Sequence, residues 1–363
     1  MKKNKNYVDL KDQPVPEGQH LLEVDDLKMY FHTEDGVVRA VDGVSYTLDR
    51  GETLGVVGES GSGKSVTAMT IMGLISMPPG KIEGGDVRYR GRSILEMTEE
   101  EMQHIRGNDI AMIFQDPMTS LNPVYKIGKQ VGEGLRLHRG YSKQEALKRA
   151  TELLDLVGIP EPEKRVNEYP HQFSGGMRQR VMIAMALACD PDILIADEPT
   201  TALDVTIQAQ IIELMQEMQE KNGNAIIMIT HDLGVVADMA DKIMVMYAGR
   251  PVEFGTAEEI FYESRHPYTW GLIRSIPEQA IDEKKPLTPI RGNPPSLMNL
   301  PEGCVFSPRC PYATDKCRKQ RPERVVTESG HYSACHYSGD PEFLKNAPET
   351  SRTRKDSKKG GEA

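Results

Sequence analysis

Stretches of almost uninterrupted apolar residues recur along the first two thirds of the chain. They are TLGVVG (53–58), IAMIF (110–114), ILIAD (193–197) and AIIMIT (225–230). Runs of this kind are typical of parallel strands that are buried on both faces. Helix-compatible segments such as YSKQEALKRATELLDLVG (141–158) separate them, and this alternation predicts an α/β domain.

Two early segments alternate between apolar and polar residues and predict a different kind of sheet. LLEVDDLKMYF (21–31) and VRAVDGVSYTLDR (38–50) follow the two-residue period of strands with one exposed face. We expect them to form an antiparallel subdomain beside the main sheet.

Changes in composition and in the apolar pattern divide the chain into segments. We expect a mobile N-terminal tail at 1–20, a main domain at 21–260 with a helical subdomain at about 116–185, a C-terminal extension at 261–338, and a disordered polar tail at 339–363. The net charge of -10 gives no support to a nucleic-acid-binding surface. The longest apolar run, VMIAMALAC (181–189), is about half of what a membrane-spanning helix needs.

A glycine-rich segment, GESGSGKS (58–65), follows the first of the apolar strands and precedes a helix-compatible run. Its glycines let the backbone curl so that amide hydrogens point at phosphate oxygens. Lys64 supplies a charge for the β and γ phosphates, and the Ser65 hydroxyl is a ligand for Mg²⁺. The residues expected to contact a nucleotide here are Gly58, Ser60, Gly61, Ser62, Gly63, Lys64, Ser65 and Val66.

Two adjacent acids, Asp197 and Glu198, end the apolar strand ILIAD. Asp197 fits the role of a hard oxygen ligand that holds Mg²⁺ through water. Glu198 then stands where it can polarise an attacking water molecule. Alone, the pair would be read as solvated loop acids; together with the phosphate loop it predicts a Mg²⁺-dependent nucleotide hydrolase.

The stretch FSGGMRQRVMIAMALACDPDILIADEPTTALD (173–204) resembles the ATP-binding subunits of ABC transporters, and the resemblance covers nearly all of 21–255. It implies a P-loop ATPase with a mixed sheet core, an antiparallel β subdomain and a helical subdomain. It also implies that SGGMRQR is a signature loop reaching the γ-phosphate held by an opposing subunit, so that two cassettes sandwich two ATP molecules.

The same resemblance assigns further residues. Gln115 is the Q-loop residue that contacts Mg²⁺ and the attacking water, and His231 is the switch histidine. Phe31 is the aromatic that stacks on adenine, although the adjacent Tyr30 is an alternative. The residues implied to bind nucleotide across the dimer are Ser174, Gly175, Gly176 and Asp204.

The C-terminal stretches RHPYTWGLIRSIP (265–277) and NPPSLMNLPEGCVFSPRCPYATDKC (293–317) resemble the ATPases of oligopeptide and dipeptide importers, a group that includes nickel importers. The resemblance implies a peripheral position on the cytoplasmic face of the plasma membrane. The implied partners are a second ATPase subunit (identical or related), two transmembrane permease subunits and an extracytoplasmic peptide-binding protein. A soluble ABC-type ATPase of DNA repair or translation is the alternative class.

Four of the five cysteines gather in the extension, at Cys304, Cys310, Cys317 and Cys335. With no export signal at the N-terminus, we expect a reducing compartment, where disulfides are disfavoured. The resemblance implies that these cysteines are ligands of a [4Fe–4S] cluster. Zinc and unligated thiols are the alternatives, although the close C-x₂₋₄-C pairs that are usual for structural zinc are missing.

Overall fold

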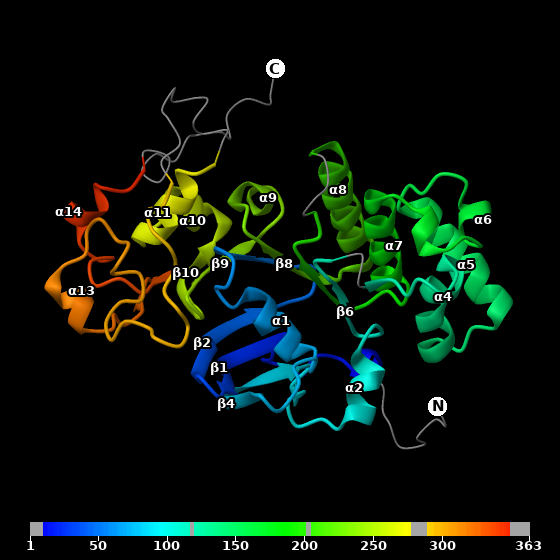
Figure 1. Cartoon of the computed structure of the whole chain (residues 1–363), viewed down its shortest axis with the longest axis horizontal. Coiled ribbons are helices and arrows are strands. Elements are labelled where there is room, and N and C mark those ends of the chain that lie inside the picture. Colours follow the sequence, from blue (N-terminus) through cyan, green and yellow to red (C-terminus); the bar gives the residue numbers. More distant parts are fainter. Residues whose placement is uncertain (1–9, 117–119, 201–204, 277–288, 349–363) are drawn as a thin grey trace.

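The computed structural model describes residues 10–116, 120–200, 205–276 and 289–348. Its longest dimension runs from the C-terminal extension, through the central sheet, to a group of helices at the other end (Figure 1). An antiparallel sheet lies along one side of the centre. Among the described residues, no helix combines the length and apolar composition that crossing a bilayer requires.

The central sheet has eight strands in the order β11-β12-β10-β9-β3-β8-β7-β6. Five of them form its parallel part: β3 (Thr53–Val57), β6 (Ile110–Ile113), β7 (Ile193–Asp197), β8 (Ala225–Thr230) and β9 (Lys242–Tyr247). Every residue of β3, β6, β7 and β8 is buried. The four strands predicted from apolar runs are therefore confirmed, because both faces of this part of the sheet are covered.

The second sheet is antiparallel, with the order β2-β1-β4-β5. Its strands are β1 (Leu22–Thr33), β2 (Gly36–Leu48), β4 (Gly80–Tyr89) and β5 (Arg92–Ser93). The pairing of β1 with β2 confirms the predicted antiparallel subdomain. A short helix, α2 (Glu99–Ile105), follows this sheet, and a capping box between Thr98 and Glu101 begins it.

Helices surround the parallel strands. α1 (Lys64–Ile71) follows β3, while α8 (Val205–Asn222) and α9 (Leu233–Ala237) flank β8 in the sequence. The helical subdomain consists of α4 (Ile127–His138), α5 (Lys143–Leu156), α6 (Pro162–Arg165), the 3₁₀ turn η2 (Pro170–Gln172) and α7 (Gly175–Leu187). The predicted helix over 141–158 is α5, which begins in a capping box formed by Ser142 and Glu145.

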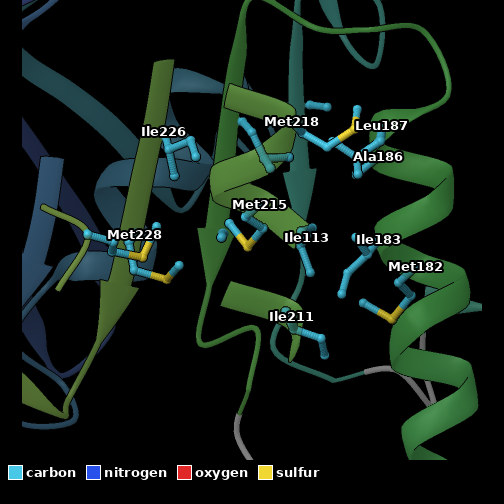
Figure 2. Close-up of a cluster of buried hydrophobic side chains, with 14 of the residues drawn as sticks. Ile113, Met182, Ile183, Ala186, Leu187, Ile211, Met215, Met218, Ile226 and Met228 are labelled. Carbon is cyan, nitrogen blue, oxygen red and sulfur yellow. The ribbon is translucent and has the colours of Figure 1, made fainter. Parts of the chain in front are cut away.

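Apolar side chains from the sheet and from two of these helices meet in one cluster (Figure 2). Ile113 of β6, Ile183 of α7 and Met215 of α8 are all fully buried there. Burial of a side chain of this size contributes about 1.5–3 kcal/mol. The cluster thus holds the helical subdomain against the central sheet.

The C-terminal extension is built onto the same sheet. β10 (Arg250–Thr256) pairs with β9 on one side and with β12 (Tyr332–Ser333) on the other, and β11 (Val325–Val326) forms the sheet edge. Its helices are α10 (Ala257–Tyr262), α11 (Pro267–Ile273), α13 (Asp315–Lys319) and α14 (Pro341–Leu344). The extension therefore shares backbone hydrogen bonds with the main domain rather than being tethered to it.

The predicted boundaries of the two tails need correction. The 3₁₀ turn η1 (Leu10–Asp12) lies within the predicted N-terminal tail, yet Leu10 is buried against the core of the antiparallel sheet. At the other end, α14 lies within the predicted C-terminal tail, and Phe343 packs 5.4 Å from the ring centre of the buried Trp270. Leu10 and Phe343 thus each pack a segment of a predicted tail against the folded domain.

Candidate nucleotide site

The glycine-rich segment 58–63 connects β3 to α1. Gly58, Gly61 and Gly63 have φ angles of 154°, 76° and 99°, a region that other residues rarely adopt. A Cβ atom at Gly58 or Gly63 would lie 2.2 or 2.3 Å from a carbonyl oxygen of a neighbouring segment. Glycine is therefore required at these two positions for conformation and for space, as the phosphate-loop prediction expects.

The side chain of Lys64 turns back over this loop. Its Nζ donates to the carbonyl oxygens of Gly58 at 2.6 Å and Glu59 at 3.1 Å. Burial lowers the pKa of the Lys64 ammonium, and the charges of Glu198 and Asp197 oppose this shift. A cation surrounded by loop carbonyls can exchange these bonds for phosphate oxygens when a nucleotide enters.

The oxygen atoms beside Lys64 suit a magnesium nucleotide. Ser65 Oγ donates to Asp197 Oδ1 at 2.9 Å, and burial raises the pKa of this aspartate. Ser62 Oγ is buried without a hydrogen-bond partner among the described residues. Hard oxygen donors and an unsatisfied hydroxyl fit Mg²⁺ and phosphate. Of the other predicted loop contacts, Ser60 is exposed and Val66 packs partly buried against the antiparallel sheet.

Glu198 contacts polar side chains from two other segments of the chain. Gln115 Nε2 donates to its Oε2 at 3.0 Å, and His231 Nδ1 lies 3.4 Å from its Oε1. The glutamate backbone has a φ of 48°, and its N–H donates to Ile229 of β8 at 2.9 Å. This left-handed turn aims the side chain away from the strand direction, where it can accept a proton from water.

Six predicted residues from four parts of the sequence meet at one end of the parallel sheet. The reason is topological, because the carboxyl ends of parallel strands lie at the same edge. They are Lys64, Ser65, Gln115, Asp197, Glu198 and His231.

The predicted signature loop opens α7. Ser174 caps the helix, its side chain accepting from the N–H of Met177 at 3.3 Å, and Ser174 and Gly175 are exposed. Within the same helix, Gln179 is buried and donates to the carbonyl oxygen of Pro199 at 2.6 Å. That bond connects the signature helix to the segment that follows Glu198.

Of the remaining predicted nucleotide contacts, the structure describes the two aromatic candidates for adenine but not Asp204. Phe31 lies near the end of β1, partly buried against the core of the antiparallel sheet. The hydroxyl of Tyr30 instead donates to Asp42 at 2.9 Å. Asp204 and the whole of TALD (201–204) lie outside the described residues.

The four clustered cysteines line one small cavity of about 20 Å³, with Phe306, Tyr312, Tyr337 and Phe343 among its other walls. Burial raises the pKa of Cys310 to about 11 and that of Cys335 to about 12, so the thiol form is favoured at neutral pH. In the part of the chain that the structure describes, no group of three or more His, Cys, Asp or Glu side chains has the arrangement of a metal-ion site.

Sequence reasoning missed a contact between the extension and the phosphate loop. Arg309, which precedes Cys310, forms an ion pair with Glu59, and the backbone N–H of Glu59 donates to Tyr268 Oη at 2.9 Å. The only available signals were a glutamate inside the phosphate loop and an arginine between a proline and a cysteine. Neither indicates a partner so far away in sequence.

An open groove of about 550 Å³ lies between β6, α7 and the segment that follows α1. Methionines and other apolar residues form much of its wall, and Phe114, which precedes Gln115, is 39% exposed there. The residues that carry this apolar surface are Met72, Leu74, Met112, Phe114, Met182 and Met185.

A phosphate loop backed by an acid pair, with a separate serine-capped helix entering from a helical subdomain, defines the class of ABC-type ATPases. In agreement, residues 41–201 match the family model described as ABC transporter. Residues 252–317 match the one described as oligopeptide/dipeptide transporter, C-terminal region.

Comparisons with whole proteins extend this result. The chain is 58% identical over 312 residues to the oligopeptide transport ATP-binding protein OppD of Bacillus subtilis, covering 86% of this chain and 87% of that protein. It is 52% identical to the dipeptide transport ATP-binding protein DppD of Escherichia coli, covering 88% and 97%. A solved dimeric, post-hydrolysis structure of the ATP-binding cassette MJ0796 with ADP and Pi superposes with a TM-score of 0.59 at 29% identity, covering 65% of this chain and 98% of that one.

The chain belongs to the ATP-binding protein family of oligopeptide and dipeptide ABC transporters. Like other ATP-binding subunits of ABC transporters, it hydrolyses ATP. The resemblance drawn from the motifs is thereby confirmed, and the alternative of a DNA-repair or translation ATPase is not favoured.

Proposed function

We propose that this chain is the ATP-hydrolysing motor of a membrane importer for peptides. The observation that carries the proposal is the convergence of Lys64, Asp197 and Glu198 at one sheet edge, in a chain that also has the C-terminal region of the peptide-transporter group. The names of the relatives support peptides as the cargo.

Each residue of the site has a chemical role in this proposal. Lys64 exchanges its loop carbonyls for phosphate oxygens, and the loop amides bind the same phosphates. Ser65, Asp197 and Gln115 would hold Mg²⁺, which would supply positive charge beside the phosphates. Glu198 accepts a proton from the attacking water.

His231 and Gln115 keep the Glu198 carboxylate in place from its two sides, since both contact it. In the proposed cycle His231 also reaches the γ-phosphate. Glu198 can then take a proton from water only where the histidine, the glutamine and the phosphate loop are assembled together.

A second cassette completes the site. The exposed, serine-capped start of α7 presents N–H groups toward solvent, and such a helix end attracts anions. We infer that it covers the γ-phosphate held by a partner cassette, either a copy of this chain or a related ATPase. The dimeric ADP-and-Pi structure of the similar cassette supports this arrangement.

The open groove beside Gln115 fits a contact with a permease subunit. The transporter would have two permease subunits, and each would contact the groove of one cassette. A methionine-rich surface adapts to an inserted helix, and the exposed Phe114 offers an aromatic anchor. The chain would then sit on the cytoplasmic face of the plasma membrane, and an extracytoplasmic binding protein would deliver the peptide.

We propose that the four clustered cysteines hold a [4Fe–4S] cluster, for which their side chains would have to rearrange, because within the described residues they do not have the arrangement of a metal-ion site. Four thiols, and no carboxylate, line their cavity, which is the donor set of such clusters. When bound, the iron would stabilise thiolates and join the segment 304–310, helix α13 and the segment that follows β12. Cys304, Cys310, Cys317 and Cys335 are the proposed ligands.

A substitution at Glu198 tests the motor function. Glu198→Gln keeps the size of the side chain and the contacts to Gln115 and His231 but cannot accept a proton. We expect unchanged ATP binding and a hydrolysis rate lower by about 100-fold or more, close to 3 kcal/mol in the barrier, together with loss of peptide uptake by the assembled transporter. Normal steady-state hydrolysis by this variant would exclude Glu198 as the base.

Anaerobic purification followed by iron, sulfide and zinc assays tests the cluster. The proposal expects about four iron and four sulfide per chain and a brown protein. A Cys317→Ser variant should lose most of the iron, whereas Cys189→Ser, at the buried cysteine outside the cavity, should keep it. Colourless, iron-free protein with full fold and activity contradicts the proposal, as does zinc in place of iron.

A further inference from the structure

Glu59 is the second residue of the phosphate loop, and its carboxylate is paired with a cation from the far end of the chain. Both terminal nitrogens of Arg309 contact it, one to each carboxylate oxygen, with Nη2 to Oε1 at 2.9 Å. The Arg309 side chain is 5% exposed and that of Glu59 is 30% exposed. A two-point pair in this setting is stronger and more directional than a surface ion pair.

The position of Arg309 is fixed by its own segment. Its Nε donates to the carbonyl oxygen of Arg291 at 2.9 Å, and its terminal nitrogens reach Ile290 O and Tyr247 Oη, each at 3.3 Å. The backbone N–H groups of Arg309 and Cys310 both donate to the carbonyl oxygen of the same phenylalanine at 3.0 Å. The guanidinium therefore projects from a tight turn of the cysteine segment and has little freedom to move.

A second group from the extension holds the backbone of the same loop residue. Tyr268 Oη accepts from the N–H of Glu59 at 2.9 Å. Tyr268 is fully buried, and its ring packs 4.7 Å from that of Tyr247 and 5.3 Å from that of Phe306, centre to centre. The extension thus contacts both the side chain and the main chain of Glu59.

Glu59 lies close enough to Lys64 to matter for phosphate binding. Its carbonyl oxygen accepts from Lys64 Nζ at 3.1 Å. An uncompensated carboxylate at this point would repel the phosphates and compete with them for the lysine.

We propose that Arg309 is a positioning residue for ATP binding: it neutralises Glu59 and fixes the phosphate loop, so that the cysteine-bearing extension forms part of the nucleotide site. Arg309 acts through Glu59 and does not itself touch the phosphates. A purely structural role, by contrast, would only hold the extension against the sheet and would leave the charge of Glu59 irrelevant to ATP.

A double-substitution experiment separates these roles. ATP affinity is measured by calorimetry on the purified full chain in EDTA, which removes Mg²⁺ and so prevents hydrolysis. Arg309→Gln should weaken ATP binding by about tenfold, because Glu59 is left uncompensated. Glu59→Gln and the double variant Glu59→Gln/Arg309→Gln should both bind within about threefold of the unchanged chain, because the offending charge is gone.

Arg318→Gln is the matched control. Arg318 lies in the same extension but is 59% exposed and, among the described residues, pairs with Asp315 alone at 3.1 Å, so its loss should leave affinity unchanged. Circular dichroism melting identifies variants that fail to fold. If Arg309→Gln does not fold, the ATP affinity of the double variant is the remaining test of the proposal.

Two results overturn the proposal. One is a folded Arg309→Gln chain that binds ATP as tightly as the unchanged chain. The other is a folded double variant whose affinity is lower by about tenfold, since removal of the glutamate charge should have restored binding.

Discussion

At the scale of single residues, Asp197 shows that the nucleotide site is held in an unfavourable state. The side chain is 4% exposed, and burial raises its pKa, although the hydrogen bond from Ser65 acts in the other direction. Mg²⁺ requires the charged form of this carboxylate, which burial disfavours. The fold therefore accepts a cost in stability where it gains a ligand.

Replacing Asp197 by Asn should relieve that cost. Because the folded pKa lies above the unfolded one, the penalty is present above the folded pKa and absent below the unfolded value of about 3.9. Urea unfolding without nucleotide should show Asp197→Asn to be more stable at pH 7, by about 0.5–2 kcal/mol, with the gap closing as the pH falls toward 4. The exposed Asp155→Asn serves as control; a less stable Asp197→Asn at pH 7 contradicts the argument.

The residues of the site differed in how readily they could be predicted. Lys64, Asp197 and Glu198 follow apolar strands, and the topology of a parallel sheet brings such positions together. The pair of Glu59 and Arg309 spans 250 positions, and no periodicity or spacing connects its members. Long-range pairs between loops depend on how the extension folds back, which local sequence does not specify.

At the scale of elements, the serine caps of two helices offer a direct comparison. Ser174 caps α7 at the proposed interface, while Ser142 caps α5 on the exposed side of the same subdomain. Loss of a serine cap costs about 1 kcal/mol. Ser174→Ala and Ser142→Ala should therefore lower stability in urea by similar amounts.

Their effects on hydrolysis should differ. In the assembled transporter, Ser174→Ala should reduce ATP hydrolysis by about tenfold or more, because it disturbs N–H groups that face the partner's phosphate. Ser142→Ala should keep its activity. Equal activity of the two variants would show that the start of α7 is only a structural cap.

Strands could be predicted from the sequence where an apolar run extended over at least four residues. β3, β6, β7 and β8 were predicted because each is a buried apolar run. β11 and β12 have two residues each, too few for a period to be recognised, and yet they attach the extension to the core sheet. The sequence therefore predicted an extension but not its fusion with the sheet.

At the scale of the whole molecule, the helical subdomain and the C-terminal extension are far apart. The helical subdomain lies at one end of the long axis and the cysteine-bearing extension at the other, with the phosphate loop between them (Figure 1). The extension reaches the phosphate loop of its own chain through Arg309, whereas the signature loop is proposed to serve a partner. Each bound nucleotide would then be contacted by the signature loop of the partner cassette, and its phosphate loop would be held by the extension of its own chain.

The central claim, that two cassettes must pair before ATP is split, is tested most directly by the hydrolysis rate per molecule of chain across a range of concentrations, with and without a related second cassette. We predict a low rate for the dilute chain, a rise as pairing increases, and loss of that rise when Ser174 is replaced in both cassettes. A dilute, unpaired chain that hydrolyses ATP at the full rate of the assembled transporter would contradict the account.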